Sequence, residues 1–528
     1  MLKDCRRLAP ILCALRARRT VVLTRLNRYP KFITEGWNND YLPVWLQEAG
    51  YNTFYTGKLM NGHSIDTYDN PYAKGWNRTN FFLDPNTYVY YNVTTQMDQQ
   101  SPHENLGDYS TDIAAHTTLA FMDEARYQDS PFFIGVAPIA PHAEVIRDPD
   151  RIAFYPPVPA HRHKHMFPNL KVPRTPNFNP STSTGTGFTR TLHQQNSTVV
   201  AYNDAFYRAR IQSLQAVDEL VDDVFLWLEA YPDILANTYV IFTTDNGFHI
   251  GQHRLPPGKT CNVEEDINIP FLIRGPGVPR GRTYEGATTH TDIVPTLFTL
   301  AGIPVHSDFD GEPMPVTAAM QRDAPRKSEH VNVEFWGTAL FEGIHTPFGE
   351  GLVPAPIISG VKGGNNTHKL LRVVGEDYSL AYGVRCTNEH ELYDMLRDPY
   401  RMHNLYPSNN TTTHNDILGF PKVPIEKVIA RLDALLLALK ACKAERCRRP
   451  WRSLHPAGNV ETLRQAMSPR YDHFYLHEQE KVTFEACAEG YLPWLEGAME
   501  PVPFLGEEEG GSFRHRKGGW YGRWEDAT

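Results

Sequence analysis

Five side chains that could bind ions follow one apolar segment in the middle of the chain: Asp245, Asn246, His249, His253 and Lys259. The segment, residues 238–244, is β-branched and aromatic, which predicts a parallel strand covered on both faces. In open α/β sheets, the loops at the carboxyl ends of such strands carry the ligands. Asp245 and Asn246 offer the oxygen atoms that Ca²⁺ or Mg²⁺ prefers, and Lys259 could reach an anion held against that cation. By itself, Asp245-Asn246-Gly247 is more often an ordinary turn.

A histidine follows a second predicted strand. Residues 131–138 are typical of a buried strand, and His142 comes just after its carboxyl end. A histidine there is placed to protonate a departing oxygen, and its ordinary pKa suits that work near neutrality. Without further support, a loop histidine is more often polar surface. His161, His163 and His165 also lie close together, but the surrounding prolines favour an irregular covering loop over a metal site.

Three blocks of sequence resemble those of type I sulfatases in the alkaline-phosphatase-like superfamily, in particular fungal arylsulfatases and N-acetylglucosamine-6-sulfatases. The blocks are residues 244–253, 270–277 and 291–297, in the order that these enzymes have. The resemblance extends from about Tyr29 to about Trp451. It implies a sulfuric ester hydrolase that acts on sulfate esters of aryl alcohols or sugars.

The resemblance also implies roles for single residues. Lys58 lies in a Gly-Lys element whose lysine binds the sulfate in the family, and Lys259 would be a second anion-binding lysine. His142 matches the family histidine that protonates the departing alcohol, a role that Lys259 could share. Asp245 and Asn246 would supply half of the shell of a Ca²⁺ or Mg²⁺ ion. Lys58, His142 and Lys259 are thus the predicted catalytic and substrate-binding residues, although a lysine at the end of a strand is more often solvated.

The sequence departs from the family's pattern at two points. Relatives begin with a strand that ends in paired aspartates, followed by a Cys-x-Pro-Ser-Arg block whose cysteine is converted to formylglycine, the nucleophile. No Asp-Asp pair precedes Tyr29, and Cys13 lacks the proline and the serine, so neither Cys5 nor Cys13 is assigned as nucleophile. With half a shell, the chain is expected to bind a cation weakly and to hydrolyse little or nothing. Many relatives also have Trp-His after the lysine, and here Asn61 or His63 is expected to supply a polar contact.

The first 28 residues are basic and arginine-rich, with no clear helical or strand period. The apolar run 11–15 is interrupted by Arg16 and fits a signal peptide poorly, and the absence of serine argues against a mitochondrial presequence. An altered or mispredicted start is the favoured explanation, and a natural pseudoenzyme with a basic arm is the alternative. Members of the family are typically secreted or lysosomal/vacuolar.

The length of 528 residues exceeds one ordinary core, so more than one domain is expected. We expect an α/β fold of the alkaline-phosphatase type, with a mixed, largely parallel sheet flanked by helices, and a smaller C-terminal α+β domain with an antiparallel sheet. Residues 1–28 would be disordered or mispredicted, 29–325 the catalytic-type domain, and 326–528 the C-terminal domain and tail. Helices are predicted at 40–50, 109–125, 203–231 and 423–441, hairpins around 88–93, and antiparallel strands at 331–336, 369–374 and 378–384.

Composition limits the partners. The net charge of −9 gives no reason to expect nucleic acid, and no apolar run is long enough to span a membrane. The oligomeric state is left open. Cys442 with Cys447, and Cys386 with Cys487, could form disulfides, with free thiols as the equal alternative. Glycosylation sequons lie at Asn77, Asn92, Asn196, Asn365, Asn409 and Asn410.

Three functions remain in competition. The first is a sulfuric ester hydrolase. The second is a catalytically dead relative that binds sulfated glycans, which predicts affinity without turnover. The third is a phosphomonoester or phosphonate hydrolase of the same superfamily, which would require a different nucleophile block.

Overall fold

The first sheet is mixed and has five strands in the order β4-β3-β2-β1-β5. The structure is a computed structural model that describes residues 28–148, 151–323, 328–345, 363–407, 417 and 419–506. β1 pairs in parallel with both β2 and β5, while β3 and β4 add antiparallel pairs. The strands are β1 (Asn52–Lys58), β2 (Arg78–Leu83), β3 (Thr94–Met97), β4 (His103–Glu104) and β5 (Phe132–Ala137). The carboxyl ends of the three parallel strands therefore meet at one edge.

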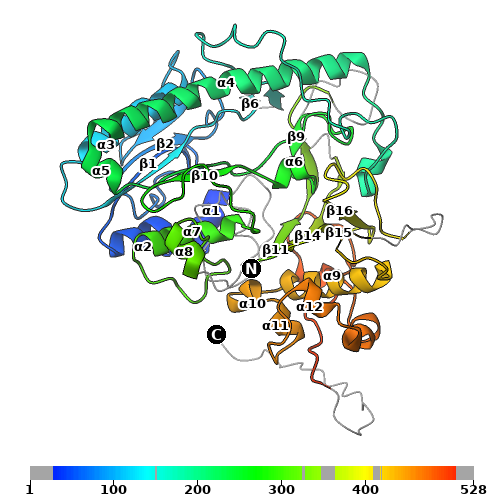
Figure 1. Ribbon diagram of the computed structural model, residues 1–528. Helices are drawn as coiled ribbons and strands as arrows, with labels where there is room; N and C mark the ends of the chain where they lie inside the picture. Colours follow the sequence, from blue (N-terminus) through cyan, green and yellow to red (C-terminus); the bar gives the residue numbers. More distant parts are fainter. Residues whose placement is uncertain are drawn as a thin grey trace, which may run out of the picture.

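Helices cover both faces of this sheet, which confirms the predicted architecture (Figure 1). On one face α3 packs against β1, β5 and α4, and on the other face α1, α2 and α7 surround an aromatic core that includes Trp45 and Phe298. α4 begins earlier than predicted because Asn196 caps it, accepting a 3.0 Å hydrogen bond from the Val199 N–H. The helices are α1 (Arg28–Thr34), α2 (Leu42–Glu48), α3 (Ser110–Ala125), α4 (Ser197–Ala230), α5 (Pro232–Ala236), α7 (Ile293–Leu300) and α8 (Ala318–Asp323).

The strand that carries Asp245 lies outside the five-stranded sheet. β8 (Val240–Thr243) and β10 (Phe271–Arg274) form a separate two-stranded antiparallel sheet. The prediction of a parallel strand covered on both faces was wrong, because Phe242 is 41% and Leu272 58% exposed. An apolar run indicates a strand but does not say which strands lie beside it. Within the described ranges, the edge of β8 opposite β10 pairs with no other strand.

The hairpins predicted around residues 88–93 are present: β2 pairs with β3 in antiparallel fashion on either side of this segment, with Leu83 opposite Thr94, and β3 pairs with β4. Residues 88–93 themselves form turns in the loop that connects β2 with β3, and Tyr88 and Tyr90 of this loop point into the molecule. The Tyr88 hydroxyl donates to Asn61 Oδ1 at 2.9 Å, and the Tyr90 hydroxyl donates to the carbonyl of His142 at 2.8 Å. Another hairpin lies further on, where β6 (Glu144–Asp148) pairs with β7 (Arg151–Tyr155).

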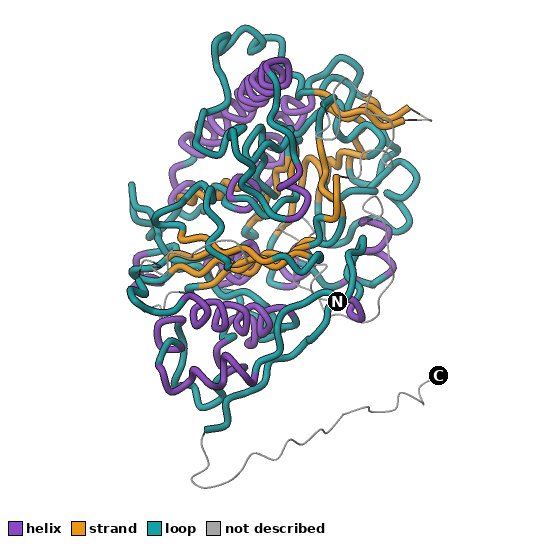
Figure 2. Tube along the Cα trace, turned by 90° about the vertical axis from the view of Figure 1, so that its right-hand side faces the viewer, coloured by secondary structure: helices purple, strands orange, loops and turns teal. Residues whose placement is uncertain are grey.

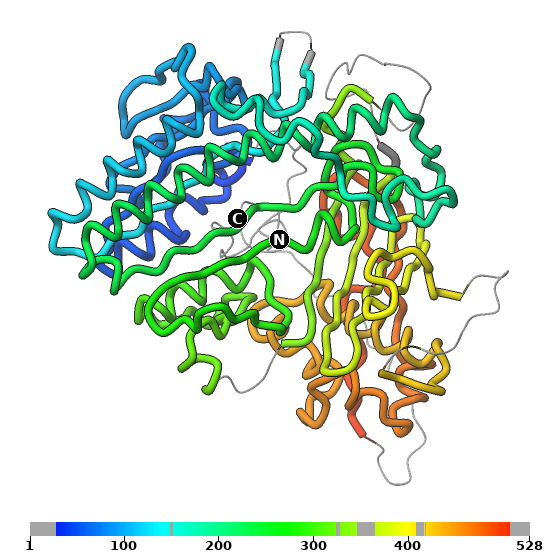
Figure 3. The backbone as a smooth tube through the Cα atoms, turned by 45° about the horizontal axis from the view of Figure 1, so that its top comes forward, coloured from blue at the N-terminus to red at the C-terminus, as the bar shows by residue number. Residues whose placement is uncertain are grey.

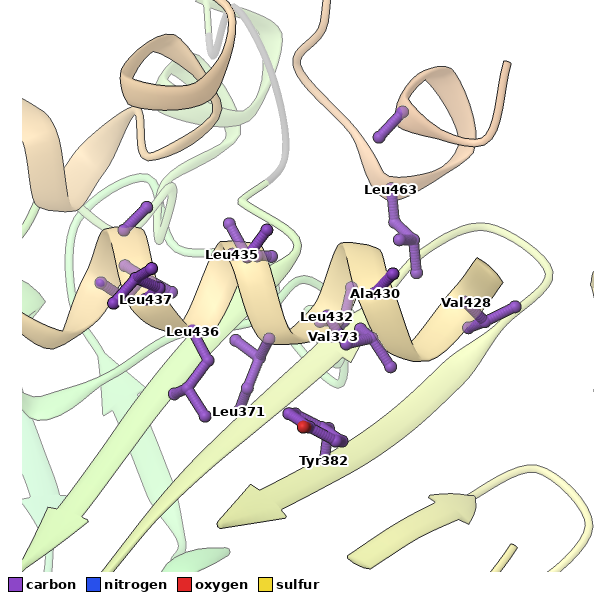
Figure 4. Close-up of a cluster of buried hydrophobic side chains, with 14 of the residues drawn as sticks. Leu371, Val373, Tyr382, Val428, Ala430, Leu432, Leu435, Leu436, Leu437 and Leu463 are labelled. Carbon is purple, nitrogen blue, oxygen red and sulfur yellow. The ribbon is translucent and has the colours of Figure 1, made fainter. Parts of the chain in front are cut away.

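The C-terminal part has the predicted antiparallel sheet, in the order β11-β14-β15-β16. Leucines of α9 (Ile425–Lys440) pack on this sheet against Leu371, Val373 and Tyr382 (Figure 4). Short helices follow α9 and close the lower end of the molecule (Figure 2). The elements are β11 (His330–Phe335), β14 (His368–Val374), β15 (Ser379–Arg385), β16 (His390–Asp394), α10 (Glu445–Arg448), α11 (Trp451–Leu454) and α12 (Leu463–Ala466).

A small three-stranded sheet joins the two parts of the chain. β9 (Gly258–Lys259) pairs with β12 (Thr338–Phe341), which also pairs with β13 (Gly363–Asn365). In Figure 3 the green segments that follow β8 run from the blue sheet towards the yellow and orange C-terminal part. β9 therefore brings Lys259 against residues that come much later in the sequence.

Both suggested disulfides are present, Cys386–Cys487 and Cys442–Cys447. No helix in the described part of the chain is both long and apolar enough to cross a membrane. Residues 1–27, the expected domain boundary near residue 325, and the sequons at Asn409 and Asn410 lie outside the described residues.

Candidate functional site

The carboxyl ends of β1, β5 and β8 bring three of the predicted residues together. Lys58 is the last residue of β1, His142 follows β5, and Asp245 follows β8. Tyr88 lies beside two of them, since its ring stacks on His142 with centroids 4.2 Å apart and the Lys58 Nζ lies 4.8 Å from its centroid. Gly57 has a φ of +105°, and a Cβ there would lie 2.1 Å from the Ala137 carbonyl oxygen. Only glycine therefore fits before Lys58.

Lys259 reaches the same place through β9. Its Nζ lies 2.9 Å from Glu342 Oε1, and His142 Nε2 lies 3.6 Å from the same oxygen. Glu342 follows β12 and is completely buried. Sequence reasoning did not identify Glu342, because no local pattern marks it and only the long-range pairing of β9 with β12 places it here.

Burial and charge set the protonation of this group. Burial, with a smaller contribution from the positive Lys259, lowers the pKa of His142 to about 4. Burial would raise the pKa of Glu342, but Lys259 and His142 hold it at about 2. Burial also lowers the pKa of Lys58, while Asp245 opposes that shift. At neutral pH the cluster therefore holds a neutral imidazole and an ionised glutamate.

Asp245 and Asn246 are suited to bind a cation. Asp245 is exposed; desolvation by the surrounding cluster would raise its pKa, yet Lys259 and Lys58 hold that pKa below its ordinary value, so the carboxylate is ionised. The Nδ2 group of Asn246 donates a 2.7 Å hydrogen bond to the Gly247 carbonyl, which leaves the side-chain oxygen available. Nearby, burial lowers the pKa of His290 to about 4 against the charge of Asp245, and its Nε2 is buried with no hydrogen-bond partner among the described residues. The side-chain oxygen atoms of Asp245 and Asn246 fit a hard cation such as Ca²⁺ or Mg²⁺.

Arg210, which sequence reasoning also missed, adds a third positive group. It lies on α4, donates to the Pro141 carbonyl at 2.8 Å, and stacks 4.0 Å above the ring of Phe248. Burial lowers its pKa to about 10, and Glu342 opposes that shift. A guanidinium remains charged at neutral pH, so the cluster is rich in positive charge.

The other predicted histidines lie in different surroundings. His63 is buried between Tyr29 and Phe81, with ring centroids 4.2 and 5.0 Å away, so the expected polar contact comes from Asn61, through Tyr88. His163 pairs with Glu219 at 2.9 Å and His161 stacks on Tyr91, which is consistent with a covering loop.

A second group of possible metal ligands lies beside the first. His249, Cys261 and Asp266 are buried, with ligand atoms within 4.8 Å of one another. Both oxygens of Asp266 already accept hydrogen bonds, from His249 Nδ1 at 2.8 Å and from the Cys261 N–H at 2.7 Å. Asp266 therefore links the segments on either side of Lys259 by hydrogen bonds, while His249 Nε2 is buried with no hydrogen-bond partner among the described residues.

Comparison with known proteins identifies the chain's relatives. Residues 18–303 match the profile of the Sulfatase family. The chain is 45% identical over 427 residues to the sulfatase ppz1 of Metarhizium majus, covering 81% of this chain and 88% of that protein. It is 34% identical over 482 residues to an arylsulfatase of Volvox carteri, covering 86% of this chain and 70% of that protein. A solved structure of a protein with its substrate D-glucosamine-2-N,6-O-disulfate has a similar fold, with a TM-score of 0.52 and 19% identity over 70% of this chain and 78% of that one.

Proposed function

Since the chain belongs to the sulfatase family of sulfuric ester hydrolases, we propose that the cluster around Lys58, His142 and Lys259 binds the sulfuryl group of an aryl or sugar sulfate ester. The observation that supports this proposal is the meeting of the two lysines with His142 and Asp245 in one cluster, to which β1, β9 and the segments after β5 and β8 contribute. The name of the Volvox relative favours an aryl sulfate as the first substrate to test.

Each residue has a role that follows from its position. The ammonium groups of Lys58 and Lys259 attract the anionic ester and neutralise its sulfuryl oxygens. The Tyr88 ring holds Lys58 and His142 in fixed orientation. The His142 Nδ1 lies 2.7 Å from the Ala143 carbonyl, which favours the proton on Nδ1 and directs Nε2 towards the cluster. A bound anion would raise the pKa of His142, so that Nε2 takes up a proton. Nε2 would then give this proton to the departing oxygen.

A cation held by Asp245 and Asn246 would polarise the sulfuryl oxygens. The formylglycine nucleophile has no counterpart among the described residues. Cys386, Cys487, Cys442 and Cys447 form disulfides, and Cys261 is buried beside Asp266. We therefore expect sulfate esters to bind while turnover stays far below the family's ordinary rates. The binding of sulfated glycans without turnover is the second candidate, which the same cluster supports.

Calorimetric titration with sodium sulfate, at an ionic strength fixed with sodium chloride, tests the binding site. Lys58→Ala and Lys259→Ala are each expected to weaken sulfate binding at least tenfold, because each removes a charge beside the anion. Lys74→Ala is the control, since that exposed lysine is bonded to Asn39 on the surface. Equal affinities in all four proteins would contradict the assignment. Hydrolysis of p-nitrocatechol sulfate at ordinary rates would refute the expected lack of turnover.

The compartment is also part of the proposal. Two disulfides indicate an oxidising environment, so we expect a secreted or lysosomal/vacuolar glycoprotein. Enzymatic removal of N-glycans from protein produced in a eukaryotic host should lower its apparent mass. Asn77, Asn92 and Asn196 are the described sequon residues outside the C-terminal part.

A further inference from the structure

Glu342 is an ionised carboxylate inside a group of residues that should receive an anion. It is 0% exposed, and Oε1 lies 2.9 Å from Lys259 Nζ and 3.6 Å from His142 Nε2. It lies outside residues 18–303, which match the family profile. Its position is fixed by the backbone, since its N–H donates to the Pro257 carbonyl at 2.7 Å.

Positive groups surround Glu342 from several elements. Lys259 faces it from β9, His142 from the loop after β5, and Arg210 from α4. Lys58 also interacts electrostatically with Glu342, and Asp245 interacts with Lys259, Lys58 and His142. An anion that binds Lys259 must therefore share that lysine with Glu342, or lie close to a second negative charge.

We propose that Glu342 opposes bound sulfate: paired with Lys259 and close to His142, its negative charge limits the affinity of the cluster for the anion. The inference rests on the proposed function and deepens it, because it assigns the control of anion release to one side chain. A site with two lysines and an arginine would otherwise retain sulfate tightly. A buried carboxylate favours departure of the dianion that hydrolysis leaves behind.

The sign of the expected effect follows from the backbone. The backbone of Lys259 is paired with that of Leu340 across β9 and β12, so the strand that carries the lysine is held without the carboxylate. Replacing Glu342 by an uncharged residue of similar size therefore removes one negative charge without releasing the lysine. At the short distances involved, Coulombic repulsion in a buried site is large, and the loss of that repulsion should strengthen sulfate binding.

The experiment compares Glu342→Gln with Glu342→Asp by calorimetric titration with sodium sulfate at pH 7 and constant ionic strength. Glu342→Gln is expected to bind sulfate at least tenfold more tightly than the parent chain, and Glu342→Asp, which keeps the charge, within about threefold of it. The matched control is Glu334→Gln, another buried glutamate paired with a lysine, Lys369, at 3.0 Å in the C-terminal sheet. It should leave the affinity unchanged.

Three outcomes would be decisive. An unchanged or weaker affinity in folded Glu342→Gln overturns the proposal. If that variant does not fold, Glu342→Met, which fills the same space without charge, carries the same expectation. Loss of binding in Lys58→Ala and Lys259→Ala supports the proposed function even where Glu342→Gln has no effect, so the two ideas fail separately. If neither the parent nor Glu342→Gln binds sulfate, both are overturned.

Discussion

His142 is neutral at pH 7, and it becomes the proton donor of the proposed reaction only after an anion binds. Its pKa of about 4 leaves it neutral at pH 7, because burial and Lys259 disfavour the imidazolium. A dianion beside Lys259 offsets that positive charge and raises the pKa. Binding of sulfate and uptake of a proton are therefore linked, and the acid would form only when substrate is present.

This linkage predicts that sulfate binds more tightly as the pH falls. Between pH 8 and pH 5 the affinity of the parent chain should rise several-fold, because protonated His142 adds a positive charge to the complex. His142→Asn should remove most of this dependence while leaving some binding through the lysines. Calorimetry in buffers with different ionisation enthalpies would measure the proton uptake directly. A flat pH profile in the parent would show that His142 does not face the anion.

A different effect is expected for His63, which is 1% exposed and whose pKa burial lowers to about 3. The ordinary pKa of 6.5 applies in the unfolded chain, so below that pH the unfolded state takes up a proton that the folded state refuses. Stability should therefore fall as the pH drops from 6.5 towards 3, by about 2 kcal/mol between pH 6.5 and 5. His63→Leu should remove this part of the loss. Urea denaturation at both pH values measures it, with the exposed His116→Leu as control.

The candidate residues differ in how far the sequence reveals them. Lys58 ends β1 and His142 follows β5, and because these neighbouring parallel strands share an edge, the meeting of these two residues could be predicted. Asp245 follows β8, which lies in a separate sheet, so its approach to them could not be predicted from strand order. Their chemical roles stay predictions. Glu342 and Arg210 could not be predicted in this way, because the first arrives through the pairing of β12 with β9 and the second through the packing of a long helix.

At the level of elements, periodicity located most helices and strands but not their neighbours. The antiparallel strands of the C-terminal sheet and α9 lie where their patterns placed them. β8 was wrongly predicted to be a parallel strand, because an apolar run indicates a strand but not the direction of the strand beside it. The hairpins around residues 88–93 were located correctly, since β2, β3 and β4 pair in antiparallel order there, but Tyr88 and Tyr90 lie in the connecting loop, where they contact Asn61 and the carbonyl of His142.

The two disulfides should contribute unequally to stability. Cys386 and Cys487 are separated by 101 positions, and Cys442 and Cys447 by 5. In the chain-entropy account the longer loop stabilises by about 4–5 kcal/mol and the shorter by about 2 kcal/mol. Cys386→Ala with Cys487→Ala should therefore lower the free energy of unfolding more than Cys442→Ala with Cys447→Ala. Urea denaturation of both double variants compares them, and equal losses would contradict this reasoning.

At the level of the whole molecule, charged side chains tie the catalytic-type part to the C-terminal sheet. Glu264 on α6 (Glu264–Ile267) pairs with Arg372 of β14 at 3.0 Å and with Arg401. Asn262 lies between Arg385 and Glu391 in the same contact. Because these groups are largely buried, neither part can be separated without leaving unpaired charges.

We therefore predict that the chain unfolds in one cooperative transition. Glu264→Gln should lower the free energy of unfolding by about 3 kcal/mol, since two arginines lose their partner, without splitting the transition. Tryptophan fluorescence and far-ultraviolet circular dichroism should follow the same urea curve in both proteins. Two separate transitions in the parent would show that the parts are independent. The exposed pair Arg452 and Glu445, changed through Glu445→Gln, is the control.

The open edge of β8 has a consequence beyond the single molecule. Among the described residues, the backbone amides and carbonyls along this edge pair with no other strand and offer a template on which a strand from another chain can add, and the exposed ring of Phe242 favours such contact. Recombinant material should thus associate as its concentration rises, which analytical ultracentrifugation over a range of concentrations would measure.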